Sequence, residues 1–165
     1  MAVKTIEDLF IHELSDAYSA EKQMTRSLPK MARAAADPQL AEAFERHLEE
    51  TQNQVLRIDQ LAEQAGIKLK RIKCVAMEGL IEEGKDLIDE IDKGPVLDAA
   101  LIGAAQKVEH YEIASYTALI LMAKQLGLGE AEQLLGETLA EEKSTDEKLG
   151  QLAAAAKLDE ALRAA

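Results

Sequence analysis

The sequence has one cysteine and no tryptophan, and only 3% of its residues are aromatic. A single cysteine, Cys74, excludes an internal disulfide framework and a zinc site built from cysteines. No stretch reaches the ~20 uncharged apolar residues that a membrane-spanning helix needs. The N-terminal segment carries acids within its apolar region and has no small-residue cleavage motif, so it does not predict a signal peptide. We therefore expect a cytoplasmic protein with no membrane partner.

Basic residues are also scarce. The chain has 19 Lys and Arg against 31 Asp and Glu, which gives a formal net charge of −12. This excess of negative charge argues against binding nucleic acid through a basic surface. The one basic run, residues 68–73, is short and is interpreted as a solvated connector.

The apolar residues are mainly Ala, Leu, Ile and Met, which mostly favour helices, and β-branched runs are scarce. Apolar positions recur at alternating steps of four and three residues, the spacing of a buried stripe on a bundle helix. The length suits one domain, which we assign to residues 1–165. The expected helices span about residues 5–35, 38–65, 74–91, 96–126 and 130–154.

Capping residues set these boundaries. Thr5 is a predicted N-cap, and Asp37 followed by a proline is predicted to begin the second helix. Gly66 and Gly127 are predicted to end helices. Pro29 lies late in the first apolar stripe and predicts a kink or an early end there.

The connection over residues 67–94 is too long for a tight hairpin and contains a short predicted helix. Two helical pairs joined by a long crossover have the connectivity of ferritin-like bundles. We therefore predict an all-α fold, a ferritin-like four-helix bundle whose long crossover contains a short extra helix.

Carboxylates interrupt the apolar stripes. Glu21 lies on the stripe of the first helix, Glu109 and Glu112 on that of residues 96–126, and Glu142 on that of the last helix. A buried, unpaired carboxylate is very unfavourable, and several together repel one another. No Lys or Arg lies on these stripes near the acids, so a pair of metal ions is the simplest compensating charge.

The acids also repeat between the two halves of the chain. Glu21 precedes Glu50 by 29 residues, and Glu112 precedes Glu142 by 30. Glu50 lies at the flank of its stripe and has polar neighbours one turn away, as does Glu142. A pseudo-symmetric pair of halves would place these groups around a common centre, suited to two cations about 3.5–4 Å apart. The candidate metal ligands are Glu21, Glu50, Glu109, Glu112, Glu142 and Asp146, with His47 and Gln54 as further candidates.

Other interpretations remain for single residues. Any one of these glutamates, taken alone, is more often a flank residue that reaches solvent. His110 is interpreted as a core or dimer-face histidine. Tyr18 and Tyr111 are either hydrogen-bond donors to the carboxylates or core packing residues.

The segments TIEDLFIHELSDAYSAEKQ, HLEETQNQ, CVAMEGLIEEG and KVEHYEIASY resemble the YciF-like stress proteins, a branch of the ferritin-like superfamily. The resemblance extends from residue 5 to about residue 152. It implies a ferritin-like four-helix bundle with an extra short helix, a homodimer, a role in bacterial stress responses and a dinuclear metal site.

The resemblance to ferritin-like di-iron proteins carries over by position. Glu21 and Glu112 match the single glutamates of two helices, and Glu50 and Glu142 match the acids of two Glu-x-x-His motifs. Neither histidine is present, because positions 53 and 145 hold asparagine and threonine. A site poor in imidazole suits Fe, Mn, or even Mg and Ca.

Three functions are compatible with these features. The first is a protein that binds two metal ions, Fe or alternatively Mn or another divalent cation, and handles iron or reactive oxygen species under stress. The second is a non-enzymatic structural or interaction stress protein with no redox-active metal. A storage role ranks last, because it needs a closed shell of subunits. Whether the protein is an enzyme stays open, and no catalytic residue or organic cofactor is assigned.

Overall fold

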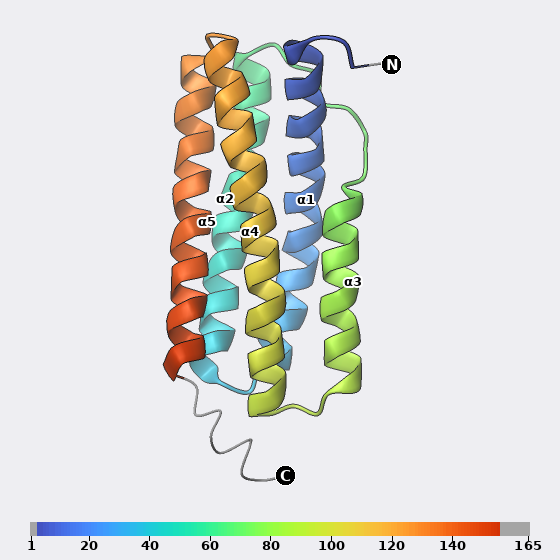
Figure 1. Cartoon of the computed structure of the whole chain (residues 1–165), viewed down its shortest axis with the longest axis vertical. Helices are drawn as coiled ribbons and strands as arrows, with labels where there is room; N and C mark the ends of the chain where they lie inside the picture. The colour runs from blue at the N-terminus through green and yellow to red at the C-terminus, as the bar shows by residue number, and fades with distance from the viewer. Residues whose placement is uncertain (1–2, 156–165) are drawn as a thin grey trace.

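The computed structural model describes residues 3–155, and these form five α-helices and no strand. The all-α prediction is therefore confirmed. Figure 1 shows the helices running side by side along one axis. Their bounds are α1 Ile6–Ala34, α2 Pro38–Gln64, α3 Val75–Glu90, α4 Pro95–Gln125 and α5 Gly129–Ala155.

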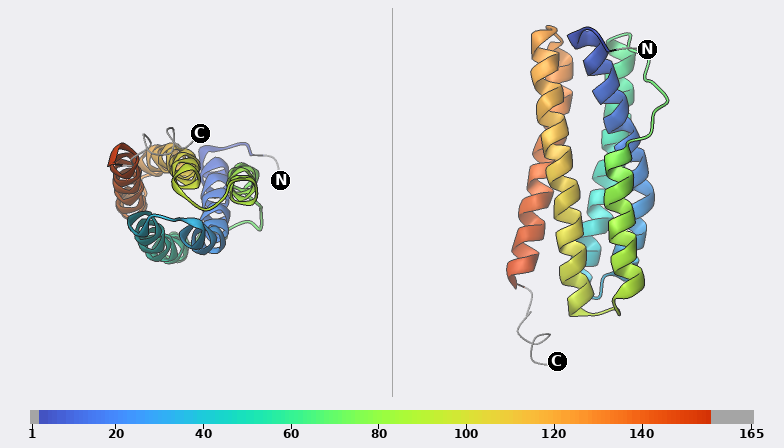
Figure 2. Two further views of the ribbon diagram at one scale, coloured as in Figure 1. Left: turned by 90° about the horizontal axis from the view of Figure 1, so that it is seen from below. Right: turned by 45° about the vertical axis from the view of Figure 1, so that its right-hand side comes forward.

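Four of the helices, α1, α2, α4 and α5, form the bundle, with α1 packed on α2 and α4 packed on α5. The short helix α3 lies outside the bundle against α1 and α4, as the end-on view in Figure 2 shows. The crossover from α2 to α4 therefore contains the extra helix that the sequence predicts. No helix in the described part of the chain is long and apolar enough to span a membrane.

The predicted caps are present at the helix ends. Thr5 and Asp8 form a capping box, in which each side chain accepts a hydrogen bond from the backbone of the other residue. The Asp37 side chain accepts a hydrogen bond from the N–H two residues later. Gly66 and Gly127 have φ angles of 65° and 71°, a region that favours glycine, so both end helices as predicted.

Helix α1 does not end at Pro29 but continues to Ala34. An internal proline costs about 3 kcal/mol because it removes a backbone hydrogen bond. Leu28 and Met31, on either side of it, are buried in the core. Burial of these two side chains favours continuation of the helix, since each contributes about 1.5–3 kcal/mol.

The apolar core has two clusters, one toward each end of the bundle. We call them the Phe44 cluster and the Phe10 cluster. The Phe44 cluster takes residues from all five helices and includes Met24, Leu28, Phe44, Leu101, Val108 and Leu149. The Phe10 cluster takes residues from α1, α2, α4 and α5 and includes Phe10, Leu14, Ile58, Tyr116, Leu119 and Leu135. On α2, α4 and α5, buried polar residues separate the two clusters, and on α1 Glu21 follows Ala20 at the edge of the Phe44 cluster.

Candidate metal centre

The segments between the two clusters turn polar side chains into the bundle. We call this set the carboxylate layer. Each member is at most 3% exposed. The layer takes one residue from α1, three from α2, two from α4 and one from α5: Glu21, His47, Thr51, Gln54, Glu109, Glu112 and Glu142. Their burial follows from the helical spacing, since each continues the stripe that apolar residues occupy above and below it.

Four members of the layer converge most closely. One ligating atom from each of His47, Glu109, Glu112 and Glu142 lies within 4.8 Å of the others. His47 Nε2 is 3.1 Å from Glu109 Oε1 and 3.7 Å from Glu142 Oε2. His47 is therefore the one nitrogen donor in this group, and it faces carboxylates from α4 and α5.

Glu21 approaches the same region from α1. The Tyr116 hydroxyl donates a hydrogen bond to Glu21 Oε1, and this leaves Glu21 Oε2 as the free oxygen of the carboxylate. Burial raises the pKa of Glu21 from 4.5 to about 7, although the Tyr116 hydrogen bond opposes this shift. Tyr116 thus fixes the orientation of the Glu21 carboxylate.

A network on the α2–α5 side holds Glu142. The Gln54 amide donates to Glu142 Oε1 and, at 2.9 Å, to Glu141 Oε2. Arg57 donates to both carboxylate oxygens of Glu141, at 3.0 and 2.9 Å, and at 2.8 Å to Thr138 Oγ1. A bidentate Arg–carboxylate pair has a defined geometry, so Arg57 and Glu141 together orient Gln54.

The layer does not satisfy its own polar atoms. Buried polar atoms in proteins nearly always have hydrogen-bond partners. Among the described residues, six buried oxygens have none, and all belong to this layer: Glu21 Oε2, Gln54 Oε1, Glu109 Oε2, Glu112 Oε1 and Oε2, and Glu142 Oε2. Glu112 has neither oxygen paired, which is unusual for a fully buried carboxylate.

The electrostatics of the layer are unfavourable without a cation. Burial, together with the neighbouring acids, raises the pKa values of Glu112 and Glu142 well above 4.5. For His47, burial lowers the pKa, but the charge of Glu109 and the hydrogen bonds to Glu109 and Glu50 outweigh it, and the pKa lies well above 6.5. One imidazolium does not balance four carboxylates.

The donor set fits divalent metal ions. Four carboxylates carry four negative charges when ionised, which two divalent cations neutralise. Carboxylate oxygens with one imidazole suit Fe, Mn and similar ions, and bound cations would give the five unpaired carboxylate oxygens a partner. Glu21, Glu109, Glu112, Glu142 and His47 are the residues that would hold such ions.

Glu50 lies at the edge of the layer. Its side chain is 33% exposed, and its Oε2 is 3.5 Å from His47 Nδ1 and 3.4 Å from Thr145 Oγ1. The hydrogen bond from His47 lowers the pKa of Glu50. Glu50 thus contacts the outer nitrogen of the imidazole and orients His47, while Nε2 faces the other carboxylates.

Asp146 lies outside the layer, so the structure does not bring it together with the other candidate ligands. Its carboxylate is 3.1 Å from Nε2 of the exposed His110 and accepts a hydrogen bond of 3.2 Å from Gln106. Four residues advance a helix by slightly more than one turn, so Asp146 lies to one side of Glu142 and meets α4 at the surface. The prediction of a core position for His110 is wrong, since the His110 side chain is 68% exposed.

Sequence reasoning missed Tyr116 and Arg57. Tyr116 occupies a position of the apolar stripe of α4, and this position alone does not distinguish a packing ring from a hydroxyl donor. Tyr18 and Tyr111 do donate to carboxylates, but the acceptors are Asp59 and Asp16, outside the carboxylate layer.

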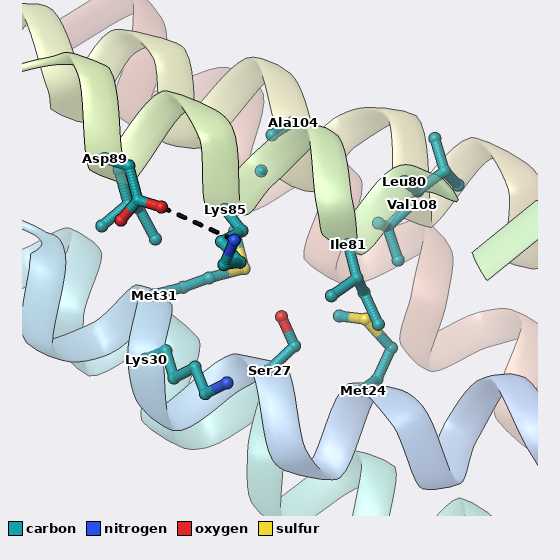
Figure 3. Close-up of a pocket in the computed structure, with 12 residues that line it drawn as sticks. Met24, Ser27, Lys30, Met31, Leu80, Ile81, Lys85, Asp89, Ala104 and Val108 are labelled. Carbon is teal, nitrogen blue, oxygen red and sulfur yellow. Dashed lines mark ion pairs between the residues drawn. The ribbon is translucent and has the colours of Figure 1, made fainter. Parts of the chain in front are cut away.

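A separate cavity of about 220 Å³ lies between α1, α3 and α4, and Figure 3 shows it. Apolar side chains such as Met24, Ile81 and Val108 line most of it. Its one carboxylate, Asp89, is paired with Lys85 at 3.6 Å. The cavity therefore lacks the unpaired donors that distinguish the carboxylate layer.

Comparison with known proteins agrees with this fold. Residues 5–162 match a family described as a domain of unknown function, DUF892. The chain belongs to the DUF892 family. The chain is 61% identical over 154 residues to protein YciF of Escherichia coli strain K12, and this alignment covers 93% of each chain.

Solved structures of relatives have the same fold. The crystal structure of the Escherichia coli stress protein YciF matches with a TM-score of 0.89 and 62% identity, covering 91% of this chain and 95% of that one. YcfI of Rhodopseudomonas palustris matches with a TM-score of 0.87 and 44% identity, covering 90% and 94%. A Xanthomonas campestris protein matches with a TM-score of 0.75 and 25% identity, covering 96% and 98%. The YciF-like resemblance and the ferritin-like helical fold are thereby confirmed.

Proposed function

We propose that this chain is a cytoplasmic stress-response protein whose carboxylate layer binds two divalent metal ions, iron in the first place, and acts on iron or reactive oxygen species. The observation that carries the proposal is the set of six buried oxygens without partners, all in one layer. The Escherichia coli relative is a stress protein, which supports the stress-response part. When bound, a pair of iron ions supplies electrons to oxygen or peroxide.

The protein residues have separate roles in this proposal. Glu21, Glu109, Glu112, Glu142 and His47 supply the ligand atoms, one or more from each bundle helix. Three further contacts orient them: Tyr116 with Glu21, Glu50 with His47, and Gln54 with Glu142. The two apolar clusters exclude water from both ends of the layer, which strengthens its electrostatic interactions.

The first test is the metal content of the protein, purified without chelator and reconstituted anaerobically with Fe(II). We expect about two irons per chain, and an optical band when air or peroxide is added. Glu21→Ala and Glu142→Ala should each abolish stoichiometric metal binding while circular dichroism still shows a helical protein. Asp146→Ala is the matched control, because it removes a nearby acid outside the layer.

Three results would each count against the proposal. The first is no bound metal in the wild type. The second is wild-type stoichiometry in both Glu variants, and the third is loss of metal in the Asp146 control as well. The first result favours a non-enzymatic stress protein.

The non-enzymatic alternative has one observation in its favour. All five ligand residues of the proposal are at most 3% exposed, and none lines the cavity of Figure 3, the groove beside Lys70 or the two pockets beside Leu128. Oxygen uptake after Fe(II) addition separates the two functions. We also expect a homodimer, which sedimentation would show as twice the chain mass, whereas a ferritin-like storage shell would be far larger.

A further inference from the structure

A groove of about 770 Å³ lies between α1 and the connector that joins α2 to α3. Figure 1 shows this connector passing beside α1 before it enters α3. The volume falls within the range of about 300–1,000 Å³ that is typical of small-molecule sites. None of the residues of the carboxylate layer lines it, so it is independent of the proposed metal centre.

The connector is a fixed wall of this groove. The backbone N–H groups of Lys70 and Cys74 donate to the hydroxyls of Ser15 and Ser19, each at 2.9 Å. The two serines are one turn apart on α1, and the two donors are four residues apart on the connector, which has no regular secondary structure there. Leu69 packs against the Phe10 cluster. These contacts hold the backbone of residues 70–73 beside α1.

The charges that line the groove have one dominant sign. The groove is lined by five basic residues, two from α1 and three from the connector: Lys22, Arg26, Lys70, Arg71 and Lys73. Asp59 is the one acid among the lining residues, and it accepts a hydrogen bond from Tyr18. In a chain with a net charge of −12, this concentration of positive charge is exceptional.

Within residues 3–155, most of these charges have no counter-ion. Among the described residues, Lys73 pairs with Glu78, while the other four basic side chains of the groove make no ion pair. Lys22 and Arg26 are also one helical turn apart, where like charges repel and destabilise the helix. A bound anion would relieve this repulsion, and a cleft of one sign attracts such a ligand from solution.

We propose that this groove binds the phosphate chain of a small molecule. Arg26 and Arg71 present planar guanidinium groups, which bind phosphate oxygens in pairs, and the lysines add point charges. Several cations around one groove match a chain of phosphates better than a single carboxylate. A nucleic acid or an anionic membrane fits less well, because either would extend beyond the groove onto a strongly acidic surface.

The chain of phosphates belongs either to an inorganic polyphosphate or to a nucleoside triphosphate. Two further residues of the groove distinguish these ligands. Tyr18 and Asp59 lie at its α1–α2 side and supply an aromatic ring and a carboxylate, groups that contact a base and a ribose. Inorganic tripolyphosphate contacts the basic residues alone. A nucleoside triphosphate would also contact Tyr18 and Asp59.

The test is calorimetric titration of the chelator-treated protein with inorganic tripolyphosphate and with ATP, at 0.15 M salt and without divalent cations. We expect saturable binding of at least one of the two. Arg26→Gln/Arg71→Gln should weaken it by about tenfold or more, because two charge-assisted contacts are lost. Arg33→Gln/Arg46→Gln is the control of equal charge outside the groove and should bind as the wild type does. Circular dichroism and the melting temperature verify that both variants fold.

The outcomes separate clearly. Equal binding of tripolyphosphate and ATP identifies the phosphate chain alone as the ligand, while tighter ATP binding that Tyr18→Ala removes identifies a nucleotide. No binding of either ligand, equal weakening in both double variants, or equally tight binding of sulfate would overturn the proposal. Preferential binding of an oligonucleotide or of anionic lipid vesicles would overturn it in favour of a macromolecular surface.

Discussion

The two apolar clusters and the carboxylate layer are equally buried, but they differ in what they need. In the Phe10 and Phe44 clusters, each side chain finds its partners within the bundle, and burial itself is the stabilising force. In the layer between them, burial removes water from four carboxylates and leaves six oxygens without partners. The clusters stabilise the fold, whereas the layer destabilises it unless a cation binds.

The position of the layer explains why the chain tolerates it. Apolar segments flank it on every bundle helix, so the helices are held together above and below the acids. The surroundings also keep the acids partly protonated, as the raised pKa values of Glu21, Glu112 and Glu142 indicate. Ligand sites in proteins are commonly less stable than the scaffold that positions them.

The largest expected effect comes from the metal itself. Free metal at about 1,000 times its dissociation constant stabilises a single site by about 4 kcal/mol, so loading the layer should raise the melting temperature by about 10 °C. Chelation should reverse the increase. Calorimetry of loaded and chelator-treated protein measures it. An identical melting temperature in both states would contradict the prediction that a cation bound in the carboxylate layer stabilises the protein.

The pH dependence of the metal-free protein should be the next largest effect. The pKa of Glu21 is about 7 in the native state against 4.5 in the unfolded chain, so the native state binds more protons between these values. This stability is fully present below pH 4.5 and is lost as pH rises through about 7. His47, with its raised pKa, acts in the same direction.

Between pH 5 and pH 8, the free energy of unfolding of the metal-free protein should therefore fall by a few kcal/mol, at about 1.4 kcal/mol per pKa unit. Urea unfolding at several pH values measures it. Stability that rises over this range would show that the acids are ionised and paired in the native state.

Removing buried charge from the carboxylate layer should make the layer less destabilising, and so bring it closer to the apolar clusters. Glu21→Gln/Glu112→Gln removes two buried charges while Tyr116 keeps an acceptor, so the metal-free protein should gain about 1–3 kcal/mol at pH 7.5. The same variant should gain less from added metal than the wild type. Thermal unfolding with and without metal gives both values, and an unchanged or lower midpoint in the metal-free variant would contradict the prediction.

The smallest effect is expected just outside the layer. Asp146→Asn removes a partner of the exposed His110, and exposed ion pairs contribute little, so stability should change by less than about 0.5 kcal/mol. Metal stoichiometry should stay at the wild-type value. Loss of bound metal in this variant would place Asp146 back among the ligands.

Helical periodicity predicted most of the layer correctly. Glu21, Glu109, Glu112 and Glu142 were identified as interior residues because they occupy stripe positions, and the structure buries all four. Asp146 lies outside the layer because a shift of four residues from a stripe position leaves the side chain near the flank. Its final direction depends on which neighbour it meets there, and that neighbour is His110 on α4.

The two halves of the site also show what pattern alone leaves open. The expected Glu-x-x-His motifs are missing, yet an imidazole is present, because His47 reaches the layer from three residues before Glu50. A position three residues before or after an acid lies on the same helical face, so periodicity permits either. Contact with Glu109 and Glu142 decides which atom of His47 faces inward.

By itself, the sequence determined the all-helical class, the helix ends and the interior position of the acids. These features depend on local interactions and on a 3.6-residue period, which neighbouring residues specify. Only the tertiary structure decided which acids meet, which oxygens stay unpaired, and how Tyr116, Gln54 and Arg57 orient the layer. The same holds for the basic groove, where α1 and a connector more than 40 residues away in the chain come together. The carboxylate layer and the groove both depend on the packing of segments distant in sequence, which no local pattern encodes.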